Sequence, residues 1–166
     1  MNISLQQDAD EFFNLLMQRL ESSLKLTPNS SLLDDIFKGT LHREIICHED
    51  NNHRSEGCED IFTLNLDIFQ RKSLEDALEL YFEGEKISGF KCAECEKEVD
   101  VTKRFSLYSL PPTLSFQLKR FKFDLTLMQR EKIYDKITFP TEINMEKYMS
   151  EDADSYEKDY YQYELV

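Results

Sequence analysis

The stretch KCAECEKEVD, residues 91–100, joins a Cys-x-x-Cys turn to the beginning of an alternating strand. The pair Cys92 and Cys95 has the spacing typical of half a zinc site, or of a redox dithiol. A redox pair is expected at the N-terminus of a helix in a β-α-β unit, and this pair lies between a glycine-bounded turn and a strand. We therefore favour half of a zinc site, whose other half must come from elsewhere in the chain.

The polar segment that begins at Cys47 offers the remaining ligands. A second Cys-x-x-Cys turn would need a cysteine at position 50, where the sequence has Asp50. His48, His53 and Cys58 lie in the same segment, and each of them could complete a tetrahedral site with three cysteines. The alternative is a site that has lost its metal and leaves free thiols.

The periodicity of apolar residues predicts an α+β fold with one long helix, one short helix and four or more mostly antiparallel strands. The helices are expected over residues 6–25, behind a capping box of Ser4 and Gln7, and after Ser73. Alternation predicts strands, and polar composition predicts loops. The expected strands are 40–47, 61–68, 99–110, 113–123 with a phase change near Lys119-Arg120, 136–140 and 163–166. The expected loops are 48–60, a turn between Gly84 and Gly89, and 150–162.

Composition narrows the class of partner. The net charge of −13 argues against binding to a phosphate backbone, so no nucleic-acid partner is expected. The sequence has no apolar run long enough to cross a bilayer and no secretory signal at its start, so no membrane partner is expected either. Four cysteines without such a signal suggest a reducing compartment, the cytoplasm or the nucleus.

Four stretches resemble motifs of the ubiquitin-specific protease family of cysteine deubiquitinases, peptidase C19. Each motif is weak alone, but the four follow the family order and together cover essentially the whole chain. The pattern ICHEDNNHRSEGCEDIFTLNLDI is similar to that of the very large, fat-facets-like members. The four stretches are QQDADEF at 6–12, SLPPTLSFQLKRF at 109–121, KITFPTEINMEKY at 136–148 and YQYELV at 161–166.

The resemblance implies the fold of that family, a partial open hand within the papain-like cysteine protease superfamily. On that pattern residues 1–38 are thumb helices, residues 39–108 are the fingers and residues 109–166 are part of the palm. The chain would then be the central part of a catalytic domain.

The resemblance also implies a structural zinc. In the family a zinc ion joins two finger hairpins through two Cys-x-x-Cys turns. Cys47, Cys92 and Cys95 match three of the ligand positions, and Asp50 stands at the fourth. A carboxylate can bind zinc, but family members without the metal exist, so its loss is the alternative.

No catalytic residue is expected in this chain. The family's nucleophilic cysteine precedes the QQD box, and its catalytic histidine follows the segment that begins with YELV. None of His42, His48 and His53, and none of the cysteines, stands in a matching context. A thiolate nucleophile needs a base within hydrogen-bonding reach, and we expect no such pair here. The isolated chain is therefore expected to be inactive.

A ubiquitin-binding role is expected for Gln7, Asp8 and Glu11. Asp8 and Glu11 are three residues apart and so share one helix face. By resemblance they meet arginines of the ubiquitin tail, and Gln7 meets the tail backbone. The alternative is that the carboxylates complement the positive N-terminus of the helix and that Gln7 serves only the capping box.

The resulting hypothesis is a part of a deubiquitinating enzyme that hydrolyses isopeptide bonds at the C-terminus of ubiquitin. Its partners would be ubiquitin and ubiquitinated proteins. Two other readings are an inactive ubiquitin-binding pseudoenzyme and a small zinc-hairpin interaction module.

Overall fold

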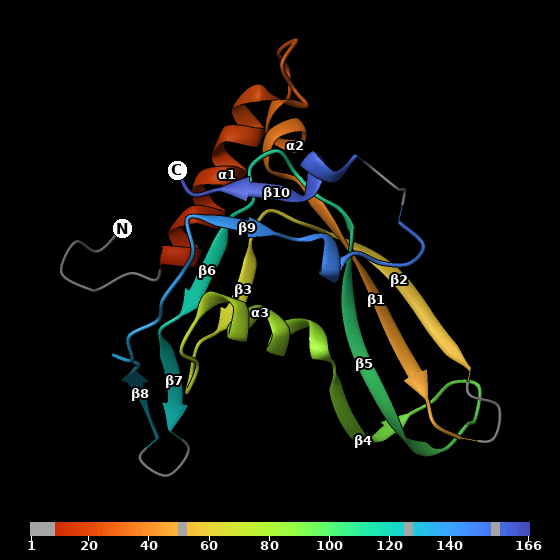
Figure 1. Cartoon of the computed structure of the whole chain (residues 1–166). Coiled ribbons are helices and arrows are strands. Elements are labelled where there is room, and N and C mark those ends of the chain that lie inside the picture. Colours follow the sequence, from red (N-terminus) through yellow and green to blue (C-terminus); the bar gives the residue numbers. More distant parts are fainter. Residues whose placement is uncertain (1–8, 50–52, 125–127, 154–156) are drawn as a thin grey trace.

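The computed structural model describes residues 9–49, 53–124, 128–153 and 157–166. A long antiparallel sheet extends from one side of a body built of helices and short sheets (Figure 1). The α+β prediction is confirmed. No helix in the described part of the chain is long and apolar enough to cross a membrane.

The long sheet has four antiparallel strands in the order β2-β1-β5-β4. Its central strands, β1 (Gly39–Cys47) and β5 (Glu98–Ser109), pair along almost their whole length. The edges are β2 (Arg54–Ile61) and β4 (Glu85–Lys91). Alternating aliphatic residues keep the central strands extended, because one face of each is buried.

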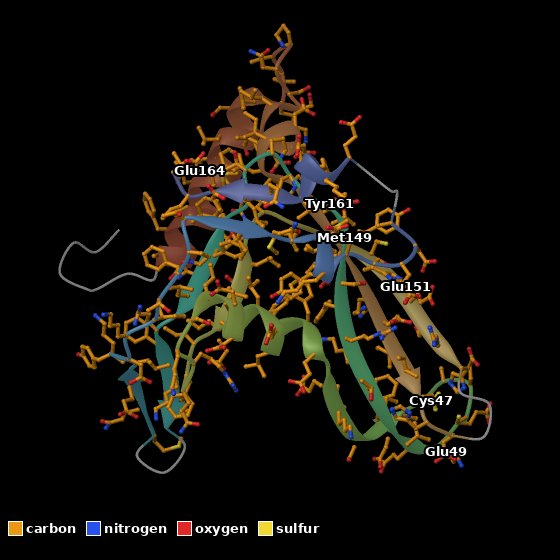
Figure 2. All side chains as sticks on the ribbon, in the orientation of Figure 1. Cys47, Glu49, Met149, Glu151, Tyr161 and Glu164 are labelled. Carbon is orange, nitrogen blue, oxygen red and sulfur yellow. The ribbon has the colours of Figure 1, made fainter. Side chains whose placement is uncertain are left out.

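The far end of this sheet, which we call the sheet tip, holds both cysteine segments. β1 ends at Cys47, and the chain returns through the β1–β2 connection. Cys92 and Cys95 lie in the turn from β4 to β5. Figure 2 shows Cys47 and Glu49 at the tip, far from Glu164 near the C-terminus.

Three helices lie outside the long sheet: α1 (Ala9–Leu24), α2 (Leu32–Phe37) and α3 (Leu74–Glu83). Helix α3 begins with a capping box, as predicted at Ser73. The Asp76 amide donates to the Ser73 hydroxyl at 3.1 Å, and the Ser73 amide donates to the Asp76 carboxylate at 3.1 Å. The predicted box of Ser4 and Gln7 lies outside the described residues.

Three two-stranded sheets complete the body. The parallel pair β3–β6 lies beside α3. A single residue, Arg120, separates β6 from β7, and this break matches the phase change predicted near Lys119-Arg120. Two 3-10 turns, η1 (Glu146–Tyr148) and η2 (Lys158–Tyr161), lie between β9 and β10 along the chain. The three pairs are β3 (Leu64–Asp67) with β6 (Phe116–Lys119), β7 (Phe121–Asp124) with β8 (Gln129–Lys132), and β9 (Glu142–Asn144) with β10 (Gln162–Glu164).

Buried apolar residues form two separate clusters. The larger one fills the body, where Leu64, Leu66, Leu107 and Met145 are fully buried. The smaller one lies at the sheet tip and contains two cysteines: its members are Cys47, Cys92, Val99 and Val101. The sheet tip therefore has a small buried core that is separate from the core of the body.

The prediction of a loop over residues 48–60 is wrong for its second half, because residues from Arg54 onward form strand β2. This strand lies at the sheet edge and is exposed on both faces for most of its length, so its sequence shows no alternation. The predicted turn between Gly84 and Gly89 is also wrong, because β4 runs through it. Gly89, with φ of 70°, marks an irregularity in that strand's pairing.

Other boundaries differ more modestly. The strand predicted at 61–68 is shorter: Leu64–Asp67 forms β3, and Ile61 is the last residue of β2. In the strand predicted at 136–140, Thr138 makes only a single bridge to Ser73. Helix α2 and strands β8 and β9 were not predicted, and the polar segment 150–162 contains the turn η2.

Candidate metal centre

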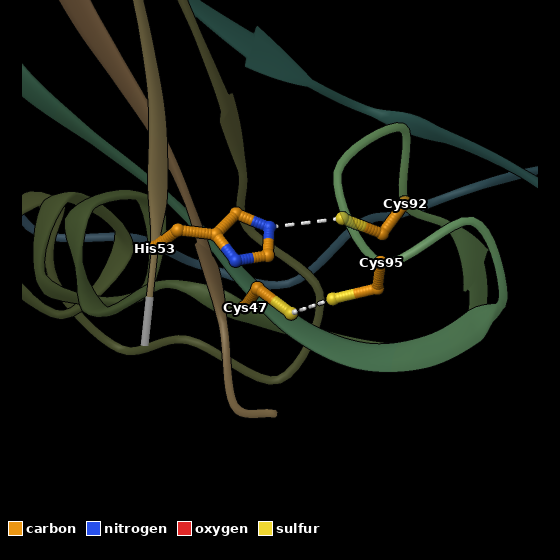
Figure 3. Close-up of side chains that lie close together, drawn as sticks. All are labelled: Cys47, His53, Cys92 and Cys95. Atoms are coloured by element: carbon orange, nitrogen blue, oxygen red, sulfur yellow. Dashed lines mark hydrogen bonds between the residues drawn. The ribbon is translucent and has the colours of Figure 1, made fainter. Parts of the chain in front are cut away.

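Four side chains from two hairpin ends converge at the sheet tip (Figure 3). Cys47 is the last residue of β1, and His53 immediately precedes β2. Cys92 and Cys95 come from the turn between β4 and β5. One ligand-type atom of each of the four lies within 4.8 Å of all the others. The cluster therefore joins segments that are far apart in the sequence.

Backbone hydrogen bonds place these side chains. The Cys47 amide donates to the His53 carbonyl oxygen at 3.0 Å, which extends the β1–β2 ladder to the tip. The Cys92 amide donates to the Lys97 carbonyl oxygen at 3.1 Å and closes the Cys-x-x-Cys turn. As a result, His53 Nε2 lies 2.9 Å from Cys92 Sγ, and the Sγ atoms of Cys47 and Cys95 lie 3.7 Å apart.

The donor set fits zinc. Three thiol sulfurs and one imidazole nitrogen form a common tetrahedral zinc ligand set. Cys47 is 2% exposed and Cys92 is 5% exposed, so the cluster is largely shielded from water. Val99 and Val101 pack with Cys47 and Cys92 in the same small buried cluster. The cluster can therefore hold a zinc ion.

The thiols differ in acidity. The pKa of Cys92 is lowered to about 7, chiefly by the backbone N–H of Cys95, with smaller contributions from His53 and the N–H of Glu94. The pKa of Cys95 is raised to about 12 by burial and by the neighbouring sulfurs of Cys47 and Cys92. Cys92 thus forms a thiolate readily, whereas ionisation of Cys95 needs a positive charge among the sulfurs, which a metal ion supplies.

The predicted ligands are distributed as follows. Cys47, Cys92 and Cys95 come together, whereas Asp50 lies outside the described residues. His53 is the fourth member of the cluster. His48 instead shares a hydrogen bond of 2.7 Å with the Thr102 hydroxyl.

The fourth cysteine of the chain lies outside this cluster. Cys58 is exposed on β2, opposite His42. Strand register would have identified the histidine of the cluster. Once β2 is known to be a strand, the pairing of Ile46 with Arg54 places Cys47 opposite His53.

The expectation that no thiol lies within hydrogen-bonding reach of a base is wrong. A thiol does lie within hydrogen-bonding reach of an imidazole, because His53 Nε2 and Cys92 Sγ are 2.9 Å apart. The pair is nevertheless crowded by two further sulfurs and has little exposed surface at the thiol. This arrangement suits a metal ligand set better than a nucleophile and its base.

The predicted ubiquitin-binding residues are only partly described. Glu11 is exposed on α1, whereas Gln7 and Asp8 lie outside the described residues. The same helix exposes a stripe of large apolar side chains, Phe12, Leu16 and Leu20, each at least 41% accessible. A groove of about 430 Å³ lies between β6 and the C-terminal residues.

Comparisons with known proteins converge on one family. The model for ubiquitin carboxyl-terminal hydrolase matches residues 1–166. Ubiquitin carboxyl-terminal hydrolase 9X of Mus musculus is 39% identical over 152 residues, covering 89% of this chain and 6% of that protein. "Probable ubiquitin carboxyl-terminal hydrolase FAF" of Drosophila melanogaster is 35% identical over 151 residues, covering 89% of this chain and 5% of that protein. These relatives include the fat-facets-like type that the sequence pattern indicated.

A solved structure is similar as well. It is the SAGA DUB module of Ubp8, Sgf11, Sus1 and Sgf73 bound to monoubiquitin, with 32% identity and a TM-score of 0.76. The match covers 87% of this chain and 34% of that one. The chain therefore spans a small part of its curated relatives and about a third of this structure.

Proposed function

The chain belongs to the ubiquitin carboxyl-terminal hydrolase family, and on that premise we propose that it is the central part of a deubiquitinating catalytic domain. The reaction of that domain is thiol hydrolysis of the isopeptide bond after the last residue of ubiquitin. The match of the family model to all 166 residues carries this proposal. The structural similarity to the ubiquitin-bound SAGA module supports it.

The domain would divide into three parts. We assign residues 1–38 to thumb helices, residues 39–108 to fingers and residues 109–166 to part of the palm. The strand bounds support this division, since the long sheet is built from segments between Gly39 and Ser109. The short sheets that follow pack with α3 around the larger core.

The cluster at the sheet tip would hold one structural zinc ion. Cys47, His53, Cys92 and Cys95 are the proposed ligands, and the metal would tie the β1–β2 end to the β4–β5 turn. Asp50 remains a competing fourth ligand. The role of the ion is structural: it stabilises the tip and so fixes the shape of the long sheet.

Recognition of the ubiquitin tail would use α1. Glu11 is exposed and would face an arginine, and Asp8, three residues earlier, would share its helix face. A carboxylate binds arginine through a bidentate pair of hydrogen bonds, so two acids on one face suit a basic tail. Gln7 would bind the tail backbone.

The test uses the longer protein that contains this chain. Its catalytic domain should release a fluorophore from a ubiquitin C-terminal amide reporter, and residues 1–166 alone should not. A domain that binds ubiquitin without cleaving the reporter would instead identify a pseudoenzyme. Failure to bind ubiquitin at all would leave the zinc-hairpin interaction module as the better description.

The Cys92–His53 contact defines a second candidate, a thiol nucleophile at the sheet tip. If it were correct, residues 1–166 alone would cleave the reporter and Cys92→Ser would abolish that turnover. Added zinc would then inhibit the reaction by occupying the thiolate. A matched Cys58→Ser variant should leave the turnover unchanged, because Cys58 lies on the exposed edge strand.

A further inference from the structure

The imidazole of His53 is engaged on both sides. Its Nε2 faces the sulfur cluster, 2.9 Å from Cys92 Sγ. Its Nδ1 faces the carboxylate of Glu94, with the nearer oxygen at 3.7 Å. The His53 side chain is only 17% accessible, so few water molecules compete for these positions. The two nitrogens therefore meet chemically different partners.

We propose that Glu94 is a positioning residue for the metal ligand His53. This inference rests on the zinc site proposed above. A neutral imidazole binds a metal through one nitrogen and carries its proton on the other, and an acceptor near the second nitrogen decides which is which. When a metal is bound, the charge of the Glu94 carboxylate, 3.7 Å from Nδ1, would favour the proton on that nitrogen and leave the Nε2 lone pair for the metal.

The sequence of the turn explains why Glu94 can do this. It lies between the two cysteines of Cys92-Ala93-Glu94-Cys95, so the same turn supplies two ligands and the orienting carboxylate. Its backbone N–H also contributes to the lowered pKa of Cys92. The Glu94 carboxylate is not among the four groups that converge as ligands.

Other acids near the tip are placed differently. Glu49 pairs with Lys97 at 2.7 Å. Glu96 is exposed in the same turn and has a positive φ of 54°. It offers a matched control, since its replacement removes one negative charge close to the cluster without touching the His53 contact that Glu94 makes.

The experiment measures zinc affinity by competition with a chromophoric chelator. The proteins are wild type, Glu94→Gln, Glu94→Met and the control Glu96→Gln, all as the 166-residue chain. Loss of an acceptor behind a ligating histidine typically weakens metal binding about 10- to 100-fold. Because Glu94 is 69% accessible, we expect about tenfold for Glu94→Met. Glu94→Gln keeps an acceptor oxygen and should lose less, and Glu96→Gln should stay within about twofold.

A second readout separates positioning from general charge or folding effects. Proton–nitrogen NMR spectra of the zinc-loaded protein report on the His53 Nδ1–H, since a ring that binds the metal through Nε2 carries its proton on Nδ1. Glu94→Met should shift the resonance of this proton and speed its exchange with water, and Glu96→Gln should change neither. Equal zinc affinity and an unchanged Nδ1–H signal in wild type and Glu94→Met would overturn the role of Glu94 alone. A wild-type chain that binds no zinc would overturn the metal site and this inference together.

Discussion

The Sγ atoms of Cys47 and Cys95 lie 3.7 Å apart, although 48 positions separate the two residues. Two sulfurs that each lie about 2.3 Å from a tetrahedral zinc ion are about 3.8 Å apart, so this distance is that of a ligand pair. A disulfide would require about 2.05 Å. The two cysteines also belong to different hairpin ends, so a metal between them closes the sheet tip as a covalent link would.

Removing zinc should loosen the sheet tip but not the body. The small cluster of Cys47, Cys92, Val99 and Val101 is separate from the larger core, so its loss should open locally. Hydrogen exchange measured by mass spectrometry should be at least about tenfold faster at the tip of β1, β4 and β5 after chelation. Exchange in α3 and β3 should not change. Uniform acceleration across the chain would show that the metal stabilises the whole fold instead.

The identity of the fourth ligand can be decided by three single variants. His53→Asn should reduce zinc content from about one ion per chain to well below that value, because it removes the only nitrogen in the described cluster. Asp50→Asn and His48→Ala should keep the metal, since His48 is bonded to Thr102. Elemental analysis of protein purified without chelator measures all three. Retention by His53→Asn together with loss in Asp50→Asn would identify the carboxylate as the ligand.

In zinc-free protein Cys92 should be the most reactive cysteine near neutral pH. Its pKa is lowered to about 7, first by the backbone N–H of Cys95 and then by His53, so half of it is thiolate at that pH. The rate of its alkylation by iodoacetamide, followed by peptide mass spectrometry, should rise with a midpoint of about pH 7. The pKa of Cys95 is raised to about 12, so Cys95 should react much more slowly. His53→Ala should move the Cys92 midpoint upward.

The strongly periodic elements of this fold could be predicted from the sequence. Helix α3 with its cap at Ser73, and strands β1 and β5, each bury one face, and burial imposes the pattern. Helix α1 was predicted from the same periodicity, although its apolar stripe of Phe12, Leu16 and Leu20 is exposed. Strand β2 could not be recognised in this way. Within the described residues it pairs with β1 alone and buries little, so its polar residues indicated a loop.

The failure to predict strand β2 also explains why the metal site was predicted incompletely. Cys92 and Cys95 were visible from their spacing, and Cys47 from its position after an alternating strand. The ligand role of His53 depends on the register of β1 with β2, which is a tertiary property. Without β2 as a strand, His48, His53 and Cys58 were equivalent candidates in one polar segment.

The long sheet also carries a buried carboxylate whose ionisation should affect stability. Glu44 is 6% exposed and is paired with Arg104 and, at 3.0 Å, with Arg54. Burial alone would raise the pKa of Glu44, but the hydrogen bond and charge of Arg104, aided by Arg54, hold it below the ordinary 4.5. A lowered carboxyl pKa adds stability above pH 4.5, and that stability is lost as the pH falls through the folded-state value.

Glu44→Gln should therefore destabilise the chain by about 1–2 kcal/mol at pH 7, with a smaller effect in acid. The difference in melting temperature between wild type and variant should be constant from pH 7 to about pH 5 and should narrow below pH 4.5. Glu85→Gln, on the exposed edge strand β4, serves as the control. A difference that stays constant down to pH 3 would show that the charge of Glu44 does not contribute.

The last prediction concerns ubiquitin binding by α1. In the catalytic domain that contains this chain, Glu11→Ala combined with Asp8→Ala should weaken ubiquitin binding and leave the melting temperature unchanged. A carboxylate–arginine contact contributes about 1–3 kcal/mol when it is shielded from water and less than about 1 kcal/mol when exposed. High salt should reduce the effect if the contact stays exposed. Glu21→Ala, near the other end of the same helix, should change neither quantity. A lower melting temperature with unchanged affinity would instead show that the acids serve only the helix N-terminus.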